Sequence, residues 1–329
     1  MKEKLIKTSF VVFLFLTALS ALTLGVEHET LDTAAQSPYR YVFLAPNKEE
    51  EYWAEVASGV KAQDQEEGSD TLLVQDKNEN LIANYLMDAR LSGAKGVILK
   101  GTNEANEEIQ KMTEEGIPVI FYNSDFPESG RTAYVGHDNY EIGRLSGELL
   151  VQTMGEKGSV FVFARTYLAS TMKDRLRGFL DYLKDYPHVQ TADFIEDRGN
   201  LLTLREAFYA ALEKEDKIQG MVSFGGMATD HLGDLLENVD GKEEMAVIVT
   251  DLSDNSAAML EKGVYDAVIS LDASEIGRKA VELLNAHDRE GKELPSEVML
   301  DLKVVTKENL PEYLFHIEEK DWEWNSYEP

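Results

Sequence analysis

Short apolar runs alternate with amphipathic stretches from residue 41 onward. In the first half of the chain the apolar runs are Tyr41–Ala45, Leu72–Val74, Val97–Leu99 and Val119–Tyr122. The amphipathic stretches between and after them are Trp53–Glu67, Leu81–Leu91 and Glu104–Glu115. Runs that are apolar throughout are typical of parallel strands buried on both faces, and apolar positions at helical spacing predict connecting helices.

The same alternation repeats after Asn139. Here the apolar runs are Val160–Phe163, Met221–Phe224, Val247–Val249 and Val268–Ile269. Helical patterns separate them near Asp174–Lys184, Leu202–Glu213, Leu232–Glu237 and Ser256–Lys262. Two rounds of strand and helix predict an α/β chain with two lobes, each built on a doubly wound parallel sheet.

The carboxyl ends of the predicted strands are where a ligand is expected. In an open parallel sheet, ligands bind beyond these ends, where the loops leave the sheet. The loops concerned are Pro46–Tyr52, Asn123–Ser129, Ala164–Ser170, Gly225–Ala228 and Asp251–Asn255. Candidate binding side chains should therefore come from these five segments.

The N-terminal segment has the pattern of an export signal. Three lysines within the first seven residues precede an uncharged, mostly apolar run at Phe10–Val26. A basic start followed by an apolar run is typical of such signals. The run approaches the length that spans a bilayer and lacks an A-x-A cleavage triplet, so we expect residues 1–26 to form an uncleaved helical membrane anchor and residues 27–38 a stalk. The alternative is a signal peptide cut near Gly25, which would leave the protein secreted or periplasmic instead of anchored to the cell surface.

Composition excludes several function classes. The chain has 329 residues, with 61 acidic and 32 basic side chains and a net charge of −29, a field that repels phosphate backbones and argues against a nucleic-acid ligand. With no cysteine there is no disulfide, thiolate nucleophile, Cys-type zinc site or lipid attachment. The histidines lack metal-ligand spacing, and they are His28, His137, His188, His231, His287 and His316. Neither a phosphate-binding motif nor a G-x-S-x-G elbow is present, so we expect no enzyme activity, no metal and no cofactor.

Several segments in a fixed order carry a resemblance to a known family. They are Gly116–Asp125, Tyr134–Asn139 leading to Gly143, Arg175–Phe179, Asp251 after Ala246–Thr250, and Glu275–Gly277. Together they resemble the type I periplasmic sugar-binding proteins, which include the ribose- and galactose-binding proteins of ABC transport systems and the effector domains of repressors. The resemblance covers nearly everything from Tyr41 to Thr306.

The resemblance implies that a sugar is held between the lobes. Tyr52 and Trp53 match the family's aromatic pair after the first strand, and Asn123 matches its Asn or Asp after the fourth. Arg175 matches the arginine before Gly-Phe, and Asp251 matches the aspartate after a strand of the second lobe. Aromatic rings suit the apolar C–H faces of a sugar, whereas planar charged groups bind adjacent hydroxyls.

A sixth candidate, Asp125, lies in the loop that begins with Asn123. Five of the six candidates also have a purely structural alternative. Trp53 could pack on the first strand, and Asn123 and Asp125 could bond to local backbone in a turn. Arg175 could pair with surface carboxylates of its helix, and Asp251 could cap the next helix.

Two departures from the family pattern concern the second lobe. The family has an Asn-Asp pair near Phe224–Gly226, and it often has Gln at the position of Leu271. Both changes remove hydrogen-bonding side chains. The resemblance therefore implies a sugar or polyol with one less polar edge, or a ligand other than a simple aldose.

The resemblance also implies lobe boundaries and a mode of action. The expected lobes are residues 39–137 plus 272–300 and residues 138–271 plus 301–329. The three hinge crossings are expected near Gly136–Asp138, Leu271–Asp272 and Leu300–Leu302. The lobes would close on a small ligand, and the closed state would be recognised by an ABC permease or by a membrane histidine kinase.

Two other function classes remain as alternatives. The effector domain of a transcription regulator is opposed by the export segment and by the lack of a basic helix-turn-helix at the start. An extracellular carbohydrate hydrolase is opposed by the lack of a recognisable nucleophile or metal site. The leading hypothesis is an extracytoplasmic solute-binding protein.

Overall fold

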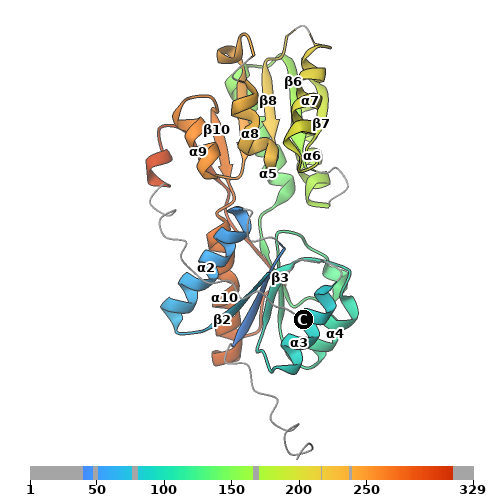
Figure 1. The fold of residues 1–329 in the computed structure, drawn as a ribbon, viewed down its shortest axis with the longest axis vertical. Helices are drawn as coiled ribbons and strands as arrows, with labels where there is room; N and C mark the ends of the chain where they lie inside the picture. The colour runs from blue at the N-terminus through green and yellow to red at the C-terminus, as the bar shows by residue number, and fades with distance from the viewer. Residues whose placement is uncertain are drawn as a thin grey trace, which may run out of the picture.

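Two α/β lobes make up the part of the chain that the computed structural model describes (Figure 1). This part comprises residues 40–46, 51–75, 81–165, 170–215, 217–236 and 239–313. Each lobe contains one six-stranded sheet, with strand order β11-β5-β4-β3-β1-β2 in the first and β12-β10-β9-β8-β6-β7 in the second. The prediction of two doubly wound sheets is confirmed. The predicted anchor at 1–26 and stalk at 27–38 lie outside the described residues.

The first lobe is built on a sheet in which all strand pairs are parallel. Its strands are β1 (Tyr41–Ala45), β2 (Thr71–Gln75), β3 (Val97–Lys100), β4 (Val119–Tyr122), β5 (Ala133–Gly136) and β11 (Glu297–Met299). Its helices are α2 (Glu51–Glu67), α3 (Ile82–Leu91), α4 (Asn106–Glu114) and α10 (Ala273–Glu290), with a 3-10 turn η2 (Pro127–Ser129). Every residue of β1, β4 and β5 is buried, which explains why these strands have no polar face.

The second lobe repeats this plan with one antiparallel edge. Its strands are β6 (Gly158–Ala164), β7 (Val189–Glu196), β8 (Gly220–Ser223), β9 (Ala246–Thr250), β10 (Ala267–Ser270) and β12 (Lys303–Val305). Its helices are α5 (Asn139–Met154), α6 (Ser170–Leu183), α7 (Leu201–Leu212), α8 (Met227–Leu236) and α9 (Asp254–Glu261), with 3-10 turns η3 (Lys242–Glu244) and η4 (Leu310–Glu312). Strand β12 runs antiparallel to β10, whereas the other pairs are parallel.

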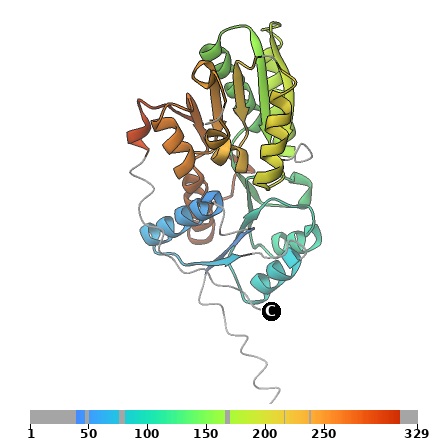
Figure 2. The ribbon, with the colours of Figure 1, turned by 45° about the horizontal axis from the view of Figure 1, so that its top comes forward.

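Within the described residues the chain passes between the lobes three times. It crosses after β5, returns after β10 and crosses again between β11 and β12. Figures 1 and 2 show the result: α10, coloured orange, lies beside the blue helix α2 in the first lobe. The first and third crossings are joined by a hydrogen bond of 2.8 Å from the Leu300 N–H to the Gly136 carbonyl oxygen.

Each lobe contains a pair of helices that pack through glycines. A Cβ on Gly143 of α5 would lie 1.8 Å from a backbone oxygen of α6, and one on Gly178 of α6 would lie 1.9 Å from a backbone oxygen of α5. In the first lobe the corresponding distances are 1.7 Å for Gly59 of α2 and 2.0 Å for Gly277 of α10. Only glycine permits so close an approach of two helix backbones.

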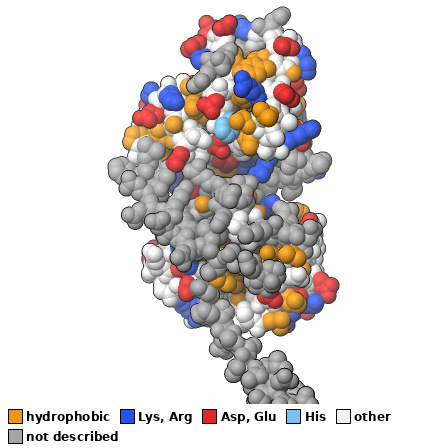
Figure 3. Space-filling view, in the orientation of Figure 1, with side chains coloured by type: hydrophobic (Ala, Val, Ile, Leu, Met, Phe, Trp, Pro, Cys, Tyr) orange, Lys and Arg blue, Asp and Glu red, His pale blue; other side chains and the backbone are white. Residues whose placement is uncertain are grey.

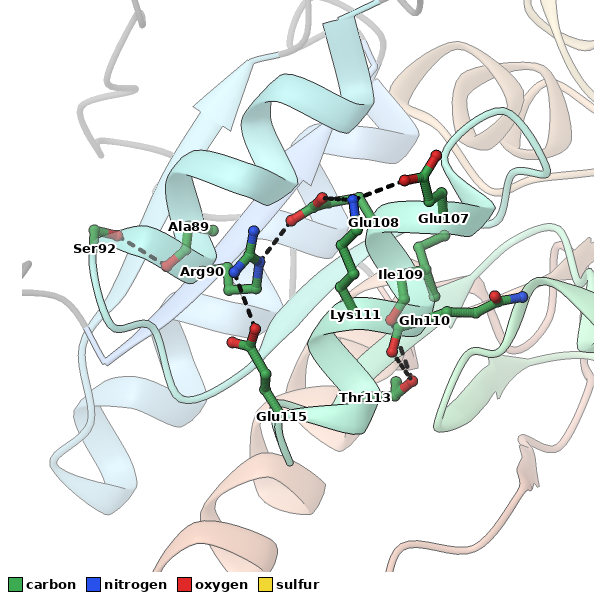
Figure 4. A network of polar contacts seen from close by, with 10 residues as sticks. All are labelled: Ala89, Arg90, Ser92, Glu107, Glu108, Ile109, Gln110, Lys111, Thr113 and Glu115. Carbon is green, nitrogen blue, oxygen red and sulfur yellow. Dashed lines mark hydrogen bonds and ion pairs between the residues drawn. The ribbon is translucent and has the colours of Figure 1, made fainter.

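Helices α3 and α4 are joined by ion pairs on the outer side of the first lobe (Figure 4). The Glu108 side chain is only 9% exposed, and its Oε1 lies 2.7 Å from Arg90 Nε. Arg90 Nη1 also lies 3.0 Å from Glu115 Oε1, and Lys111 Nζ lies 3.6 Å from Glu108 Oε2. Each charge of this cluster has a partner within the lobe, so its role is to hold the two helices together.

Acidic side chains are spread over the visible face of both lobes and do not gather in one patch (Figure 3). This distribution is typical of a solvated surface. In the part of the chain that the structure describes, none of the helices has both the length and the apolar character that crossing a bilayer requires.

Candidate functional site

Asn123 and Asp251 occupy equivalent positions in the two lobes. Asn123 directly follows β4 and Asp251 directly follows β9, and these strands have the same place in the two sheet orders. Both residues have left-handed backbone conformations, with φ of 62° and 72°. This conformation is unfavourable for a residue with a side chain, and such strain concentrates at functional sites. The pair therefore marks the facing strand ends as the candidate site.

Aromatic side chains surround Asn123 in the first lobe. The Tyr52 hydroxyl hydrogen-bonds to the Asn123 side chain, and the Tyr134 hydroxyl donates to the Asn123 carbonyl oxygen over 3.3 Å. The Trp53 ring packs edge-on against Tyr52, with 4.8 Å between centroids, and against Tyr122 at 5.9 Å. Trp53 is only 7% exposed, so most of its surface belongs to the core of the lobe, whereas Tyr52 is partly exposed.

Arg175 is held inside the second lobe by neutral oxygens. Its Nε donates to Asn139 Oδ1 over 2.9 Å, and its Nη1 donates to the Phe224 carbonyl over 3.2 Å and to Thr250 Oγ1 over 3.4 Å. Arg175 is 8% exposed, and no carboxylate of the described residues lies within ion-pair distance of it. The guanidinium is thus fixed in direction while its charge remains uncompensated at short range.

The neighbouring arginine shows the contrast. Arg177, two residues further along α6, is exposed and pairs with Asp174 over 2.9 Å. Surface pairing is therefore the role of Arg177, while Arg175 points into the lobe.

The Asp251 carboxylate is partly desolvated and incompletely paired. Its Oδ1 atom is buried and has no hydrogen-bond partner among the described residues. Burial raises the pKa of Asp251, the nearby Arg175 opposes this shift, and Asp230 adds to it. A buried acceptor without a donor costs free energy, about 1–3 kcal/mol for such groups. Asp251 is thus prepared to accept a hydrogen bond from a bound molecule.

Charged groups of the second lobe affect the pKa values of two tyrosines in the first lobe. Burial raises the pKa of the Tyr52 phenol well above its usual range, Asp251 of the other lobe raises it further, and Arg175 opposes the shift. Burial likewise raises the pKa of Tyr134 to about 12, and Arg175 again lowers it. The structure therefore brings Tyr52 and Asn123 from one lobe together with Arg175 and Asp251 from the other.

Asp125 contacts a different partner. Arg131 Nη2 donates to Asp125 Oδ2 over 2.6 Å, and Arg131 Nε donates to the other oxygen. Arg131, whose side chain is 4% exposed, also donates to the Ser296 carbonyl over 2.6 Å. Both oxygens of Asp125 are thus occupied, and the residue supports the loop that carries Asn123.

The two positions that depart from the family pattern are apolar in the structure. Leu271 is 5% exposed and packs with Ile142 and Ile269, between the lobes' crossings. The Phe224 ring is in the core, and only its backbone carbonyl contributes, as an acceptor for Arg175.

Sequence reasoning missed the residues that orient the candidates. Asn139 and Thr250 hold Arg175, and Tyr134 holds the backbone of Asn123. Asn139 and Tyr134 lie within the recognised segment Tyr134–Asn139, but no sequence signal indicated which partner each would contact. In the described ranges, no group of three or more His, Asp or Glu side chains is arranged to hold a metal ion.

The chain belongs to the periplasmic binding protein family, because the model of that family's domain matches residues 41–293. It is similar to the D-apiose import binding protein of Actinobacillus succinogenes, with 24% identity over 221 residues, which are 64% of this chain and 69% of the relative. It is also similar to the ribose import binding protein of Haemophilus influenzae, with 21% identity over 306 residues, 89% of this chain and 99% of that one.

Among solved structures, a glucose-galactose binding protein from Geobacillus stearothermophilus has a TM-score of 0.74 and 26% identity, covering 83% of this chain and 99% of that one. By their names, these relatives are binding proteins for D-apiose, for ribose, and for glucose and galactose. The chain is accordingly a type I periplasmic sugar-binding protein by family, and its role is binding rather than catalysis.

Proposed function

We propose that this protein captures a sugar or polyol between its two lobes. The observation that carries the proposal is the approach of Tyr52 and Asn123 in one lobe to Arg175 and Asp251 in the other, with an unpartnered oxygen on Asp251. A molecule that bridges the lobes must offer both donors and acceptors, and the hydroxyl rim of a sugar does so.

Each side chain has a distinct part in this proposal. The guanidinium of Arg175 donates to ring or hydroxyl oxygens, and the Asp251 carboxylate accepts from one or two hydroxyls. The Asn123 amide can both donate and accept hydrogen bonds, and Tyr52 offers a ring face and a hydroxyl group. Trp53, being mostly buried, contributes at most one ring edge and otherwise stiffens the aromatic group.

Capture then requires closure about the three crossings. A ligand shifts an open form toward a closed form only by binding the closed form better, so residues of both lobes must touch it. The proposed rigid units are residues 39–137 plus 272–300 and residues 138–271 plus 301–329.

The proposed partner of the closed form is an ABC permease in the membrane, which this protein would meet on the side away from the cytoplasm. The names of the two curated relatives, both import binding proteins, support this choice. A membrane histidine kinase is the other proposed partner. Permease and ATPase genes next to this gene would favour transport, whereas adjacent kinase and regulator genes would favour sensing.

The binding test is a melting-temperature screen of residues 27–329 with D-apiose, D-ribose, D-glucose and D-galactose. A ligand that binds only the folded state stabilises it by about 2.7 kcal/mol at a hundred times its Kd, so binding should raise the melting temperature by several degrees. Arg175→Ala should abolish the rise, and Arg177→Ala, on the exposed side of the same helix, should keep it. The proposal is wrong if no member of a broad sugar and polyol panel raises the melting temperature, or if Arg175→Ala binds like the parent protein.

A further inference from the structure

The first crossing between the lobes contains a buried histidine. His137 directly follows Gly136, the last residue of β5, and precedes Asp138, which caps α5. It is only 5% exposed, and its Nε2 atom is buried with no hydrogen-bond partner among the described residues. The one histidine at a crossing is thus held away from water in the arrangement that the structure shows.

Charged groups from the second and third crossings and from α6 act on this ring. Arg175 approaches from α6, Asp272 from the second crossing, and Asp301 and Lys303 from the third. Lys303 Nζ forms an ion pair with the Asp272 carboxylate. Asp272 also has a left-handed backbone, with φ of 39°, and accepts a hydrogen bond from the Glu275 N–H at the start of α10.

The surroundings oppose a positive charge on His137. Asp272, the acidic group with the largest effect on this ring, is already paired with Lys303, and Arg175 adds a positive charge. The pKa of His137 is lowered to about 4, chiefly by burial and secondly by the charge of Arg175. Asp272 acts in the opposite direction. The ring is therefore neutral at neutral pH. Its protonation is more favourable in any arrangement that exposes the ring to water.

We propose that His137 makes the lobe arrangement sensitive to protons: its protonation favours separation of the lobes at the three crossings and so weakens ligand capture. The first half of this inference concerns the hinge alone. The second half rests on the proposed function, because a sugar must be contacted by both lobes at once.

The size of the effect follows from linkage. An exposed histidine has a pKa of about 6.5, and this ring has one of about 4 in the arrangement described. If opening restores the ordinary value, the equilibrium between the described and open arrangements shifts roughly 30-fold toward opening when the pH falls from 7.5 to 5. The dependence lies between the two pKa values and is absent above pH 7.5.

The hinge test uses the distance between the lobes without any ligand. The chain has no cysteine, so Asn103→Cys after β3 and Arg198→Cys after β7 allow two specific spin labels on exposed positions. We expect the distance distribution to move toward longer values between pH 7.5 and 5. The same labels in His137→Gln should show no such shift, and in His188→Gln, which removes an exposed histidine, the shift should persist.

An NMR titration and a second variant make the test independent of one variant. An NMR titration of the six histidines should find one ring, absent from the His137→Gln spectrum, that titrates well below the others. His137→Asn serves as a second variant should His137→Gln lose its native circular dichroism. An ordinary pKa for His137, or an equal pH response with and without it, overturns the proposal.

Binding is then measured with the same four sugars at pH 7.5 and pH 5. We expect Kd to rise by up to roughly 30-fold in the parent protein, and His137→Gln to lose that dependence. Absence of binding at pH 7.5 would contradict the proposed function and leave the distance measurement to decide on the hinge. A pH-dependent distance with a pH-independent Kd would overturn the second half of the inference.

Discussion

The carboxylate of Asp251 occupies the space that the Cβ atom of any larger residue at position 225 would need. A Cβ at position 225 would lie 2.1 Å from Asp251 Oδ2. Gly225 also has a left-handed backbone, with φ of 88°, directly after Phe224, whose carbonyl holds Arg175. Gly225 thus provides room for the carboxylate of the next strand end.

Gly225→Ala should displace the Asp251 carboxylate and weaken sugar binding by about tenfold, the effect of losing one charged hydrogen bond. Gly241→Ala is the matched control, because Gly241 has a similar φ of 75° but nothing within 4 Å of its added Cβ. Both variants share the strain of about 1 kcal/mol that a left-handed backbone imposes on alanine. Only the first variant should therefore change the Kd measured by calorimetry. Equal Kd values in the two variants would show that Asp251 does not contact the ligand.

Asp251→Asn should stabilise the sugar-free protein at neutral pH while reducing affinity. The folded-state pKa of Asp251 is raised, chiefly by burial, so ionisation of this carboxyl works against folding above that pKa. The cost disappears as the pH falls through the raised pKa, so the gain from Asn should be largest at pH 7 and shrink on acidification. Melting temperatures of both proteins from pH 4 to pH 8 check this sign. A gain that grows toward low pH would contradict it.

Gly143→Ala should destabilise the second lobe by about 2–4 kcal/mol. The added Cβ would lie 1.8 Å from the Arg175 carbonyl oxygen, so α5 and α6 must move apart. Gly147→Ala on the same helix is the control, since its Cβ would meet the Tyr182 side chain at 3.1 Å, a group that can shift. Urea unfolding should show a loss within about 1 kcal/mol for the control. Similar losses for both would mean that the backbone contact has no special role.

Asp125→Asn should cost about 2 kcal/mol of folding free energy, because it removes the bidentate partner of the buried Arg131 guanidinium. The remaining ion pair of Arg131, with the half-exposed Glu297, is longer at 3.5 Å. Asp174→Asn breaks a pair with Arg177 whose side chains are 44% and 62% exposed, and its cost should stay within about 0.5 kcal/mol. Chemical denaturation of both variants measures the difference. If Asp125 instead contacts the ligand directly, its substitution will change Kd more than stability.

Most of the fold could be predicted because buried parallel strands are apolar on both faces. The runs at Tyr41–Ala45 and Val119–Tyr122 match β1 and β4 residue for residue. Strand β7 was missed because it lies at a sheet edge, where Gln190 and Phe194 are exposed and polar residues break the run. Helix α5 was also missed, because the small residues Gly143, Ser146 and Gly147 interrupt the apolar side of its buried face.

The candidate site could be predicted only as a set of strand ends. The rule for parallel sheets places Asn123 and Asp251 at facing edges, and the structure brings them together with Arg175. The partners could not be predicted, since they depend on side-chain packing across elements. The contact of Trp53 with Tyr122 joins a helix to a distant strand, and the pairing of Asp125 with Arg131 depends on the shape of one loop.

The glycine-packed helix pairs have a practical consequence for reporting ligand capture. In each lobe one helix of the pair starts at a crossing and the other carries a candidate contact, such as Arg175 on α6 beside α5. Since the backbones of each pair touch, a dye attached to the exposed side of α5 or α10 would travel with its whole lobe. Such a pair of dyes would convert the protein into an optical sensor without altering any residue that meets the analyte.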